Sequence, residues 1–171
     1  AESRLKLLQL QLEPHFLFNT LGSAQQLAEK GAPEAARLIS DLIRFLRAAT
    51  PALRNEMTTI AEEAAMIRAY LGIMGTRLGK RLAWSVEVAP ELADVPIPPG
   101  MLITLTENAI KHGIEPAPRG GRVDVSVRRE DDAIALCVTD TGVGLASSSS
   151  SGGIGLANIR QRLDLLFGAP A

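Results

Sequence analysis

The sequence predicts an α+β fold, with a helical N-terminal half followed by a half in which strands and helices alternate. Up to about Leu78, apolar residues recur three and four positions apart, which is the spacing of one helical face. After Gly79 the period changes to two in the stretch RLAWSVEV. A chain of 171 residues with 46% hydrophobic content can bury one core or two small ones. We therefore expect one unit over residues 1–79 and another over residues 80–171.

The first predicted helix holds a proline inside its apolar pattern, in the stretch QLEPHFLFNTL (residues 11–21). Leu8, Leu12 and Phe16 lie four residues apart and form one apolar stripe. An interior proline removes one main-chain donor and crowds the carbonyl four residues earlier, at a cost of about 3 kcal/mol or more. We therefore expect the helix to bend at Pro14, directly beside His15.

A second helix is predicted in AARLISDLIRFLRAA (residues 35–49), with Pro33 in its first turn. Its apolar residues at helical spacing are Leu38, Leu42, Phe45 and Leu46. The connection to the first helix is short, which favours a helical hairpin. Both apolar faces are too wide for one hairpin to cover, so we expect two chains to form a four-helix bundle, packed by Phe16 and Phe18. The sequence thus predicts a homodimer.

The third predicted helix runs from near Ile60 to Leu78, where Gly79 ends it. Residues 75–81 are expected to form a flexible connection to the second half. That half should contain a strand at 81–88, a proline-rich turn at 95–100 and a helix at 101–113. A hairpin of two strands at 120–130 and 132–140 follows, and then a last helix at 155–168.

Bulk composition excludes some classes of function. The formal net charge is −1 and neither sign collects in a long block, so we expect no nucleic-acid partner. No apolar stretch reaches the roughly 18 residues of a membrane span, and no signal peptide is visible. Cys137 is the single cysteine and lies in the apolar stretch AIALCV, which predicts a buried, inert thiol in a reducing cytoplasm.

Two glycine-rich loops flank a serine run in TGVGLASSSSSGGIG (residues 141–155). Gly142 and Gly144 follow a strand that ends in Asp140, while Gly153 and Gly155 open the last predicted helix. Glycines let the main chain approach a ligand, and a helix N-terminus favours phosphate. The loops therefore indicate a nucleotide site, although ordinary turns would give the same pattern of glycines.

Three polar residues of the helix at 101–113 share one predicted face, because Asn108, Lys111 and His112 stand at positions i, i+3 and i+4. An amide oxygen is a suitable ligand for Mg²⁺, and an ammonium group neutralises phosphate. The alternative is a solvated helix face on which Glu107 and Lys111 form an ion pair. The residues alone do not decide between the two.

Four motifs in order, PHFLFNTL, ENAIKHG, DTGVG and GGIGLANIRQRL, resemble the LytS-type sensor histidine kinases, whose catalytic domain belongs to the GHKL ATPase superfamily. The resemblance implies an α/β sandwich that binds ATP and Mg²⁺ and autophosphorylates His15. It further implies that Asn108 is the Mg²⁺ ligand, that Asp140 binds the adenine amino group and that the serine run is the ATP lid. Lys111, His112 and the glycines of the two loops, Gly142, Gly144, Gly153 and Gly155, would surround the nucleotide.

The chain also departs from the family pattern. Phe16 stands where many histidine kinases have an acidic residue, so Glu13 is the candidate base. Asn19, one turn after His15, is a candidate for phosphatase activity towards a phosphorylated regulator. The ATPase fold normally continues past the helix that ends at Gly168, so the sequence looks truncated at its C-terminus.

The resemblance implies a response regulator receiver domain as partner. It also implies an upstream sensor region, so that this chain would be the cytoplasmic portion of an inner-membrane sensor protein. The alternative function is an ATP-binding dimeric interaction module without kinase activity. A free-standing ATP hydrolase is less well supported, because Thr104 occupies the position of the glutamate that activates water in hydrolytic members of the superfamily.

Overall fold

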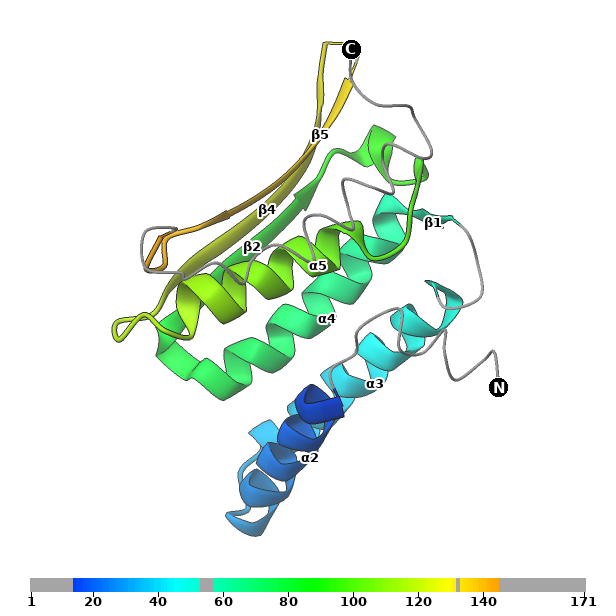
Figure 1. Cartoon of the computed structure of the whole chain (residues 1–171). Helices are drawn as coiled ribbons and strands as arrows, with labels where there is room; N and C mark the ends of the chain where they lie inside the picture. Colours follow the sequence, from blue (N-terminus) through cyan, green and yellow to red (C-terminus); the bar gives the residue numbers. More distant parts are fainter. Residues whose placement is uncertain (1–13, 53–56, 132, 145–171) are drawn as a thin grey trace.

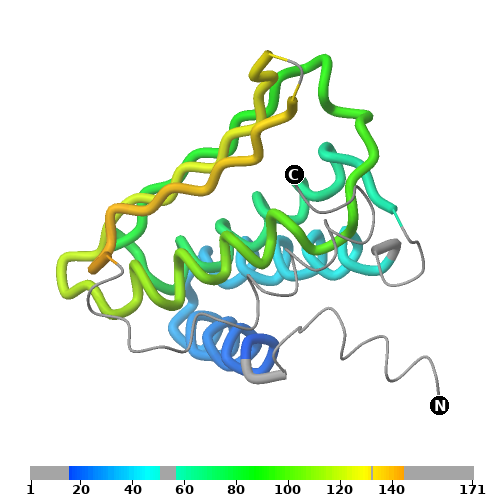
Figure 2. The backbone as a smooth tube through the Cα atoms, turned by 45° about the horizontal axis from the view of Figure 1, so that its top comes forward, coloured from blue at the N-terminus to red at the C-terminus, as the bar shows by residue number. Residues whose placement is uncertain are grey.

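The structure, a computed structural model, describes residues 14–52, 57–131 and 133–144, and it arranges them in layers. A three-stranded sheet forms one outer layer, and helices α4 and α5 cover one of its faces (Figures 1 and 2). A hairpin of helices α2 and α3 packs against α4, away from the sheet (Figure 1). The predicted α+β class is confirmed. The last predicted helix, at 155–168, lies outside the described residues, as do the residues before the predicted bend at Pro14.

Helices α2 (Pro14–Glu29) and α3 (Glu34–Ala52) form the predicted hairpin. Gly31 has φ +65 and ends α2, since its N–H donates to Ala28 and the N–H of Ala32 donates to Leu27. This pair of bonds is the Schellman arrangement, which needs a left-handed residue such as glycine. Pro33 lies one residue before the start of α3, and not in its first turn as we expected.

The hairpin packs on α4 (Ile60–Leu78) through an aromatic cluster. The ring of Phe16 lies 5.5 Å from that of Phe45 and 5.4 Å from that of Tyr70, between centroids. Leu38 and Leu42 of α3 are buried beside them. Phe18 is 73% exposed in the single chain, and Leu46 is also exposed. The packing of Phe18 in a bundle of two chains stays a prediction.

Helix α4 has a complete capping box at its start. The hydroxyl of Thr59 accepts from the N–H of Glu62, and the Glu62 carboxylate accepts from the N–H of Thr59. These bonds, with a further one from the Thr58 hydroxyl as the largest cause, lower the pKa of Glu62. Strand β1 (Thr58–Thr59), just before α4, pairs antiparallel with β3 (Pro96–Ile97).

The prediction of a flexible connection at residues 75–81 is wrong. Helix α4 continues through Gly75, where a Cβ would lie 3.4 Å from Nε1 of Trp84. Gly79, with φ +57, ends α4, and the short helix η1 (Gly79–Arg81) leads directly into β2. Arg81 Nη2 donates to the carbonyls of Glu115 at 3.0 Å and Ala117 at 2.8 Å. Packing and hydrogen bonds therefore tie this segment to the sheet.

The sheet has the order β2 (Leu82–Val88), β4 (Gly121–Glu130) and β5 (Ala133–Asp140). Strands β4 and β5 form the predicted antiparallel hairpin, and β2 runs parallel to β4. The helix-facing residues Val123, Val125 and Val127 are buried. Cys137 is exposed, contrary to prediction, because strand alternation turns it to the other face, which α4 and α5 do not cover.

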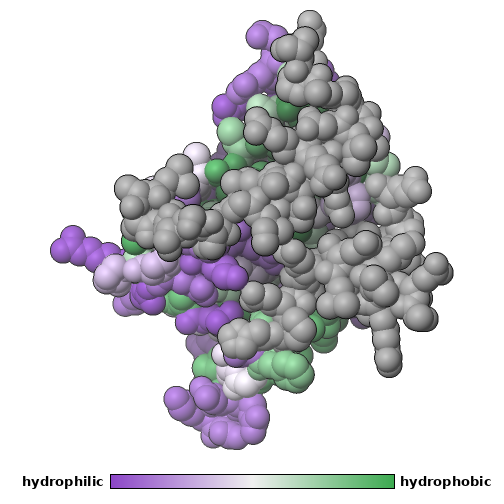
Figure 3. All heavy atoms as spheres, in the orientation of Figure 1, coloured by the Kyte–Doolittle hydropathy of each residue, from purple (hydrophilic) through white to green (hydrophobic). Residues whose placement is uncertain are grey.

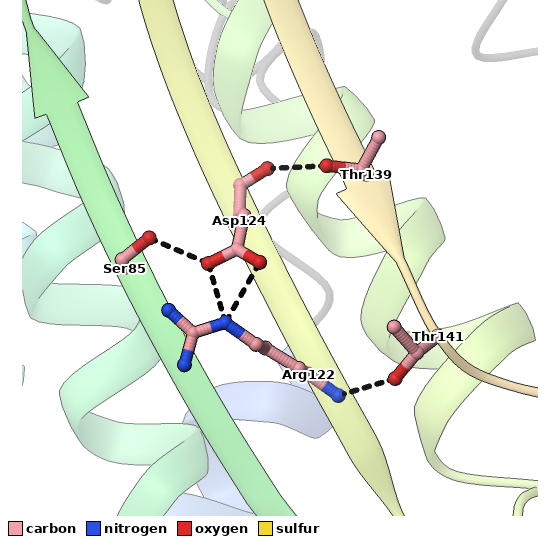
Figure 4. A network of polar contacts seen from close by, with 5 residues as sticks. All are labelled: Ser85, Arg122, Asp124, Thr139 and Thr141. Carbon is pink, nitrogen blue, oxygen red and sulfur yellow. Dashed lines mark hydrogen bonds and ion pairs between the residues drawn. The ribbon is translucent and has the colours of Figure 1, made fainter.

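The face turned away from α4 and α5 carries a polar network (Figure 4). Arg122 Nε donates to both carboxylate oxygens of Asp124, at 2.8 and 2.7 Å, and the hydroxyl of Ser85 donates to the same carboxylate. These hydrogen bonds, that from Arg122 first, lower the pKa of Asp124. The network joins β2 to β4 on the side of the sheet that faces away from α4 and α5.

Helix α5 (Met101–Asn108) continues as a π-helix, η3 (Ala109–Ile114), rather than as the uniform α-helix that we expected. Its start is held by a buried carboxylate from α4. Glu63 is 1% exposed and accepts from the N–H groups of Gly100 at 2.7 Å, Leu102 at 3.0 Å and Ile103 at 3.4 Å. A negative charge at a helix N-terminus satisfies its free donors and is favoured by the helix dipole.

We predict that Glu63→Gln destabilises the fold by about 1–3 kcal/mol, because the amide nitrogen of glutamine would face main-chain donors and leave some of them unsatisfied. Urea-induced unfolding measures the loss. Glu91→Gln, the same substitution at an exposed position, should leave stability unchanged. Equal stability of the two variants would contradict the role given to Glu63.

Candidate functional site

The site is built where the end of β5 meets the end of η3. Asp140 is the last residue of β5 and is paired with the buried Val123, which places its side chain on the helix-facing side of the sheet. There it lies directly against Gly113. A Cβ at Gly113 would overlap Oδ1 of Asp140 and lie 2.8 Å from its Cγ. The carboxylate therefore occupies the space that any side chain at position 113 would fill.

The loop after β5 is fixed to the same glycine by its main chain. The N–H of Gly142 donates to Oδ1 of Asp140 at 2.9 Å, and the N–H of Val143 donates to the carbonyl of Gly113 at 3.1 Å. A Cβ at Gly142 would overlap the main chain of Gly113, so this close approach requires glycine. Gly144 has φ +74. The DTGVG motif is thus a turn built around Gly113.

The three polar residues predicted to share a helical face span a change in helix type. Asn108 ends α5 and is half-buried, whereas Lys111 (exposed) and His112 (half-buried) lie in η3. The N–H of Glu115 bonds the carbonyl of Ile110 at 2.8 Å, an i→i−5 bond that widens the turn. The α-helical spacing that we assumed from Asn108 therefore does not apply to Lys111 and His112. π-Helical turns occur frequently at functional sites.

These groups suit a nucleotide with its cation. Oδ1 of Asp140 accepts from Gly142, and within the described residues no hydrogen bond reaches Oδ2, so this exposed carboxylate can accept from an amino group. Asn108 offers an amide oxygen for Mg²⁺ on the same helical segment. The described part of the chain holds no cluster of three His, Cys, Asp or Glu side chains for a metal. A cation held by one side chain, with phosphate and water as its other ligands, is the usual arrangement for Mg²⁺.

The remaining predicted site residues either belong to α2 or lie outside the described residues. His15 and Asn19 belong to α2, in the hairpin layer, and Asn19 is half-buried. The structure does not describe the His15 side chain. Glu13, the serine run, Gly153 and Gly155 also lie outside the described residues. The structure therefore brings together Asp140 and Gly142 but not the acceptor helix.

Sequence reasoning missed Gly113 and Glu63. A glycine inside a helical pattern costs about 1 kcal/mol relative to alanine and usually has a packing reason, which was the available signal for Gly113. No local signal identifies Glu63, because its partners lie almost 40 residues further along the chain.

Comparison with known proteins adds to these observations. Residues 3–82 match the family described as histidine kinase, and residues 100–170 match the histidine kinase-, DNA gyrase B- and HSP90-like ATPase family. No helix in the described ranges has the length and apolar content to cross a membrane.

Three similar proteins are sensor proteins of bacteria. The chain is 34% identical to sensor histidine kinase YesM of Bacillus subtilis, over 99% of the chain and 30% of that protein. It is 31% identical to sensor histidine kinase/phosphatase LytS of Staphylococcus aureus, over 99% of the chain and 31% of that protein. For sensor protein LytS of Oceanobacillus iheyensis the identity is 29%, over 98% and 31%.

The chain thus spans about a third of the length of these relatives. Its two matched segments follow one another in the order that the motifs predict. These matches confirm the predicted resemblance: the chain belongs to the sensor histidine kinases of the LytS and YesM type.

Proposed function

We propose that this chain is the transmitter of a two-component system, in which ATP phosphorylates His15 and the phosphoryl group then passes to an aspartate of a response regulator. The observation that carries the proposal is the Asp140 carboxylate, which lies against Gly113 within the segment that matches the ATPase family and whose Oδ2 accepts no hydrogen bond from the described residues. A phosphorylated imidazole is a labile P–N species suited to onward transfer.

In the proposed ATP site, Asp140 accepts from the exocyclic amine of adenine and thereby favours adenine over guanine. Asn108 coordinates Mg²⁺, and Lys111 and His112 lie next to the phosphates. Gly144, Gly153 and Gly155 complete the loops around the nucleotide. Mg²⁺ would neutralise phosphate charge during transfer, which is the chemistry that it supplies when bound.

We predict that Asp140→Asn weakens ATP binding by about ten- to a hundredfold, because a hydrogen bond to a charged acceptor is worth about 1.5–3 kcal/mol. Titration of a fluorescent ATP analogue with Mg²⁺ measures the affinity. Asp131→Asn is the matched control, since Asp131 lies in the turn at the other end of the hairpin and its φ of +51 suits asparagine equally well. Unchanged affinity in Asp140→Asn would count against the site.

The phosphoacceptor belongs to α2, which Phe16 anchors to Phe45 and Tyr70. A neutral imidazole is a good nucleophile near neutral pH. In this proposal Glu13 accepts the proton, and Asn19 orients water for the reverse, phosphatase reaction. Pro14 bends the helix beside the acceptor and so presents the imidazole to the γ-phosphate.

We predict that His15→Ala abolishes incorporation of phosphate from γ-labelled ATP yet retains ATP affinity, since acceptor and nucleotide belong to different layers. The label on the parent chain should be acid-labile and base-stable. The chain has two histidines, so His112→Ala is the natural comparison and should still be labelled at saturating ATP. Acid-labile label on His15→Ala would refute the assignment, and an unlabelled parent chain would favour the interaction module.

Thr104 gives less support to hydrolysis of ATP by water than to transfer of phosphate to histidine. Thr104 stands four residues before Asn108, and its hydroxyl donates to the carbonyl of Gly100 at 2.6 Å. A hydroxyl engaged in this way is a poor base for activating water, which supports transfer to histidine over hydrolysis.

Homodimerisation is supported by the exposed apolar residues of the hairpin. Helices α2 and α3 expose Phe18, Leu21, Ile39, Ile43 and Leu46, by 73, 52, 44, 45 and 39%. In Figure 3, hydrophobic atoms lie over these helices, above a hydrophilic hairpin end. Exposed apolar residues gathered on two helices are typical of a protein interface, and a second hairpin would complete a four-helix bundle.

We predict that Ile43→Glu converts a dimer into a monomer, because it places a charge in the centre of this apolar face. Sedimentation at tens of micromolar protein reports the change. Arg37→Glu also adds a carboxylate to the exposed surface of α3, but away from the apolar face, and should remain dimeric. A monomeric parent chain would overturn the bundle.

For the whole protein, we propose an upstream sensor region in the inner membrane with this chain on the cytoplasmic side, a receiver domain as partner and no nucleic-acid partner. The division at residue 79 remains part of the proposal. Helix α4, N-terminal to it, contacts both α3 and β2, so it links the phosphotransfer unit to the ATP-binding unit.

A further inference from the structure

We infer that Gly113 is the positioning residue that sets adenine specificity, because its missing side chain provides the space in which the Asp140 carboxylate is held. This inference rests on the proposed ATP site and deepens it. Gly113 touches no nucleotide in this scheme. It acts through Asp140 alone.

A side chain at position 113 would meet one neighbour first, the side chain of Asp140. The three atoms nearest to a Cβ at Gly113 all belong to the Asp140 side chain: Oδ1, Cγ and, at 3.3 Å, Oδ2. At Gly142 the corresponding Cβ would meet main-chain atoms of Gly113. A methyl group at 113 would therefore displace a rotatable side chain, whereas one at 142 would displace backbone.

The main chain of Gly113 is held on both sides, so it is Asp140 that must move. The carbonyl of Gly113 accepts from Val143, and the π turn around it is closed by the bond from Glu115 to Ile110. Gly113 is also buried. Rotation of the Asp140 side chain would break its bond to the N–H of Gly142 and carry the carboxylate away from its place at the end of the sheet.

Displacement of the Asp140 carboxylate should weaken binding of the adenine base and leave binding of the triphosphate unchanged. The carboxylate accepts from the adenine amine, whereas guanine carries a carbonyl oxygen at that position and is repelled by it. Specificity is a difference of two affinities, and a displaced carboxylate removes both the attraction and the repulsion. Gly113→Ala should therefore lower ATP affinity and reduce the preference for ATP over GTP together.

The test compares four forms of the full chain: the parent, Gly113→Ala, Asp140→Ala and the double variant. Dissociation constants for ATP and GTP are measured with Mg²⁺. We expect Gly113→Ala and Asp140→Ala each to lose at least about tenfold in ATP affinity and most of the ATP preference. The double variant should bind like Asp140→Ala, within about twofold, because both changes remove the same interaction.

Gly72→Ala is the matched control. Gly72 lies in α4, and a Cβ there would stand 2.8 Å from Oδ2 of Asp41, so it also pairs a helical glycine with an aspartate side chain. It contacts α3 instead of the sheet and should keep parental ATP and GTP affinities.

The outcomes separate the two proposals. If Asp140→Ala is weakened and Gly113→Ala binds like the parent, the inference about Gly113 fails and the ATP site stands. Losses that multiply in the double variant would also overturn the inference, because Gly113 would then act independently of Asp140. If Asp140→Ala itself keeps parental affinity and preference, the proposed adenine contact fails and the inference fails with it.

If Gly113→Ala does not fold, thermal unfolding of the double variant tests the inference instead. Truncating Asp140 removes the overlapping atoms, so the double variant should regain a folding transition close to that of Asp140→Ala. A double variant that fails to fold would show that position 113 clashes with the backbone, and would overturn the inference.

Discussion

The Glu63 carboxylate fixes the start of the helix that carries part of the proposed nucleotide site. Glu63 lies on the buried side of α4, and its carboxylate accepts hydrogen bonds from three main-chain N–H groups at the start of α5. A buried charge is costly unless it is fully bonded, so this arrangement tolerates little displacement of one helix against the other. The start of α5 is held by α4, and its continuation, η3, is held by the loop after β5 through Gly113. Asn108 lies between these two points of attachment.

The π turn explains why these attachments meet. An α-helix that continued past Asn108 would present different residues to the sheet. Because one wider turn is inserted, Gly113 faces the end of β5, where Asp140 and Gly142 use the space that it leaves. Glycine at 113 and glycine at 142 are thus two halves of one contact. The cost of glycine in a helix is offset by the closeness that it permits.

The sequence predicted the elements well because their patterns are strong and local. The helix over Ile60–Leu78 has an apolar period, a cap and a glycine stop, and the strands after it alternate clearly. The π turn escaped prediction since nothing in ENAIKHG distinguishes it from an α turn. Cys137 was assigned to the core because AIALCV is apolar throughout, and only the register with β4 shows which face it occupies. Asp140 was found through its motif, whereas Gly113 and Glu63 become meaningful only through contacts distant in sequence.

The passage from α4 into β2 bears on how the proposed ATP site and His15 are connected. Trp84 against Gly75, and the Arg81 bonds to Glu115 and Ala117, join the end of α4 to the sheet and to the end of η3. Helix α4 is therefore attached directly to the elements that hold the proposed nucleotide site. Phe16 joins α2, which carries His15, to α3 and α4 through Phe45 and Tyr70. In the proposed transfer within one chain, any shift of the α2–α3 hairpin on α4 would therefore rearrange this aromatic contact.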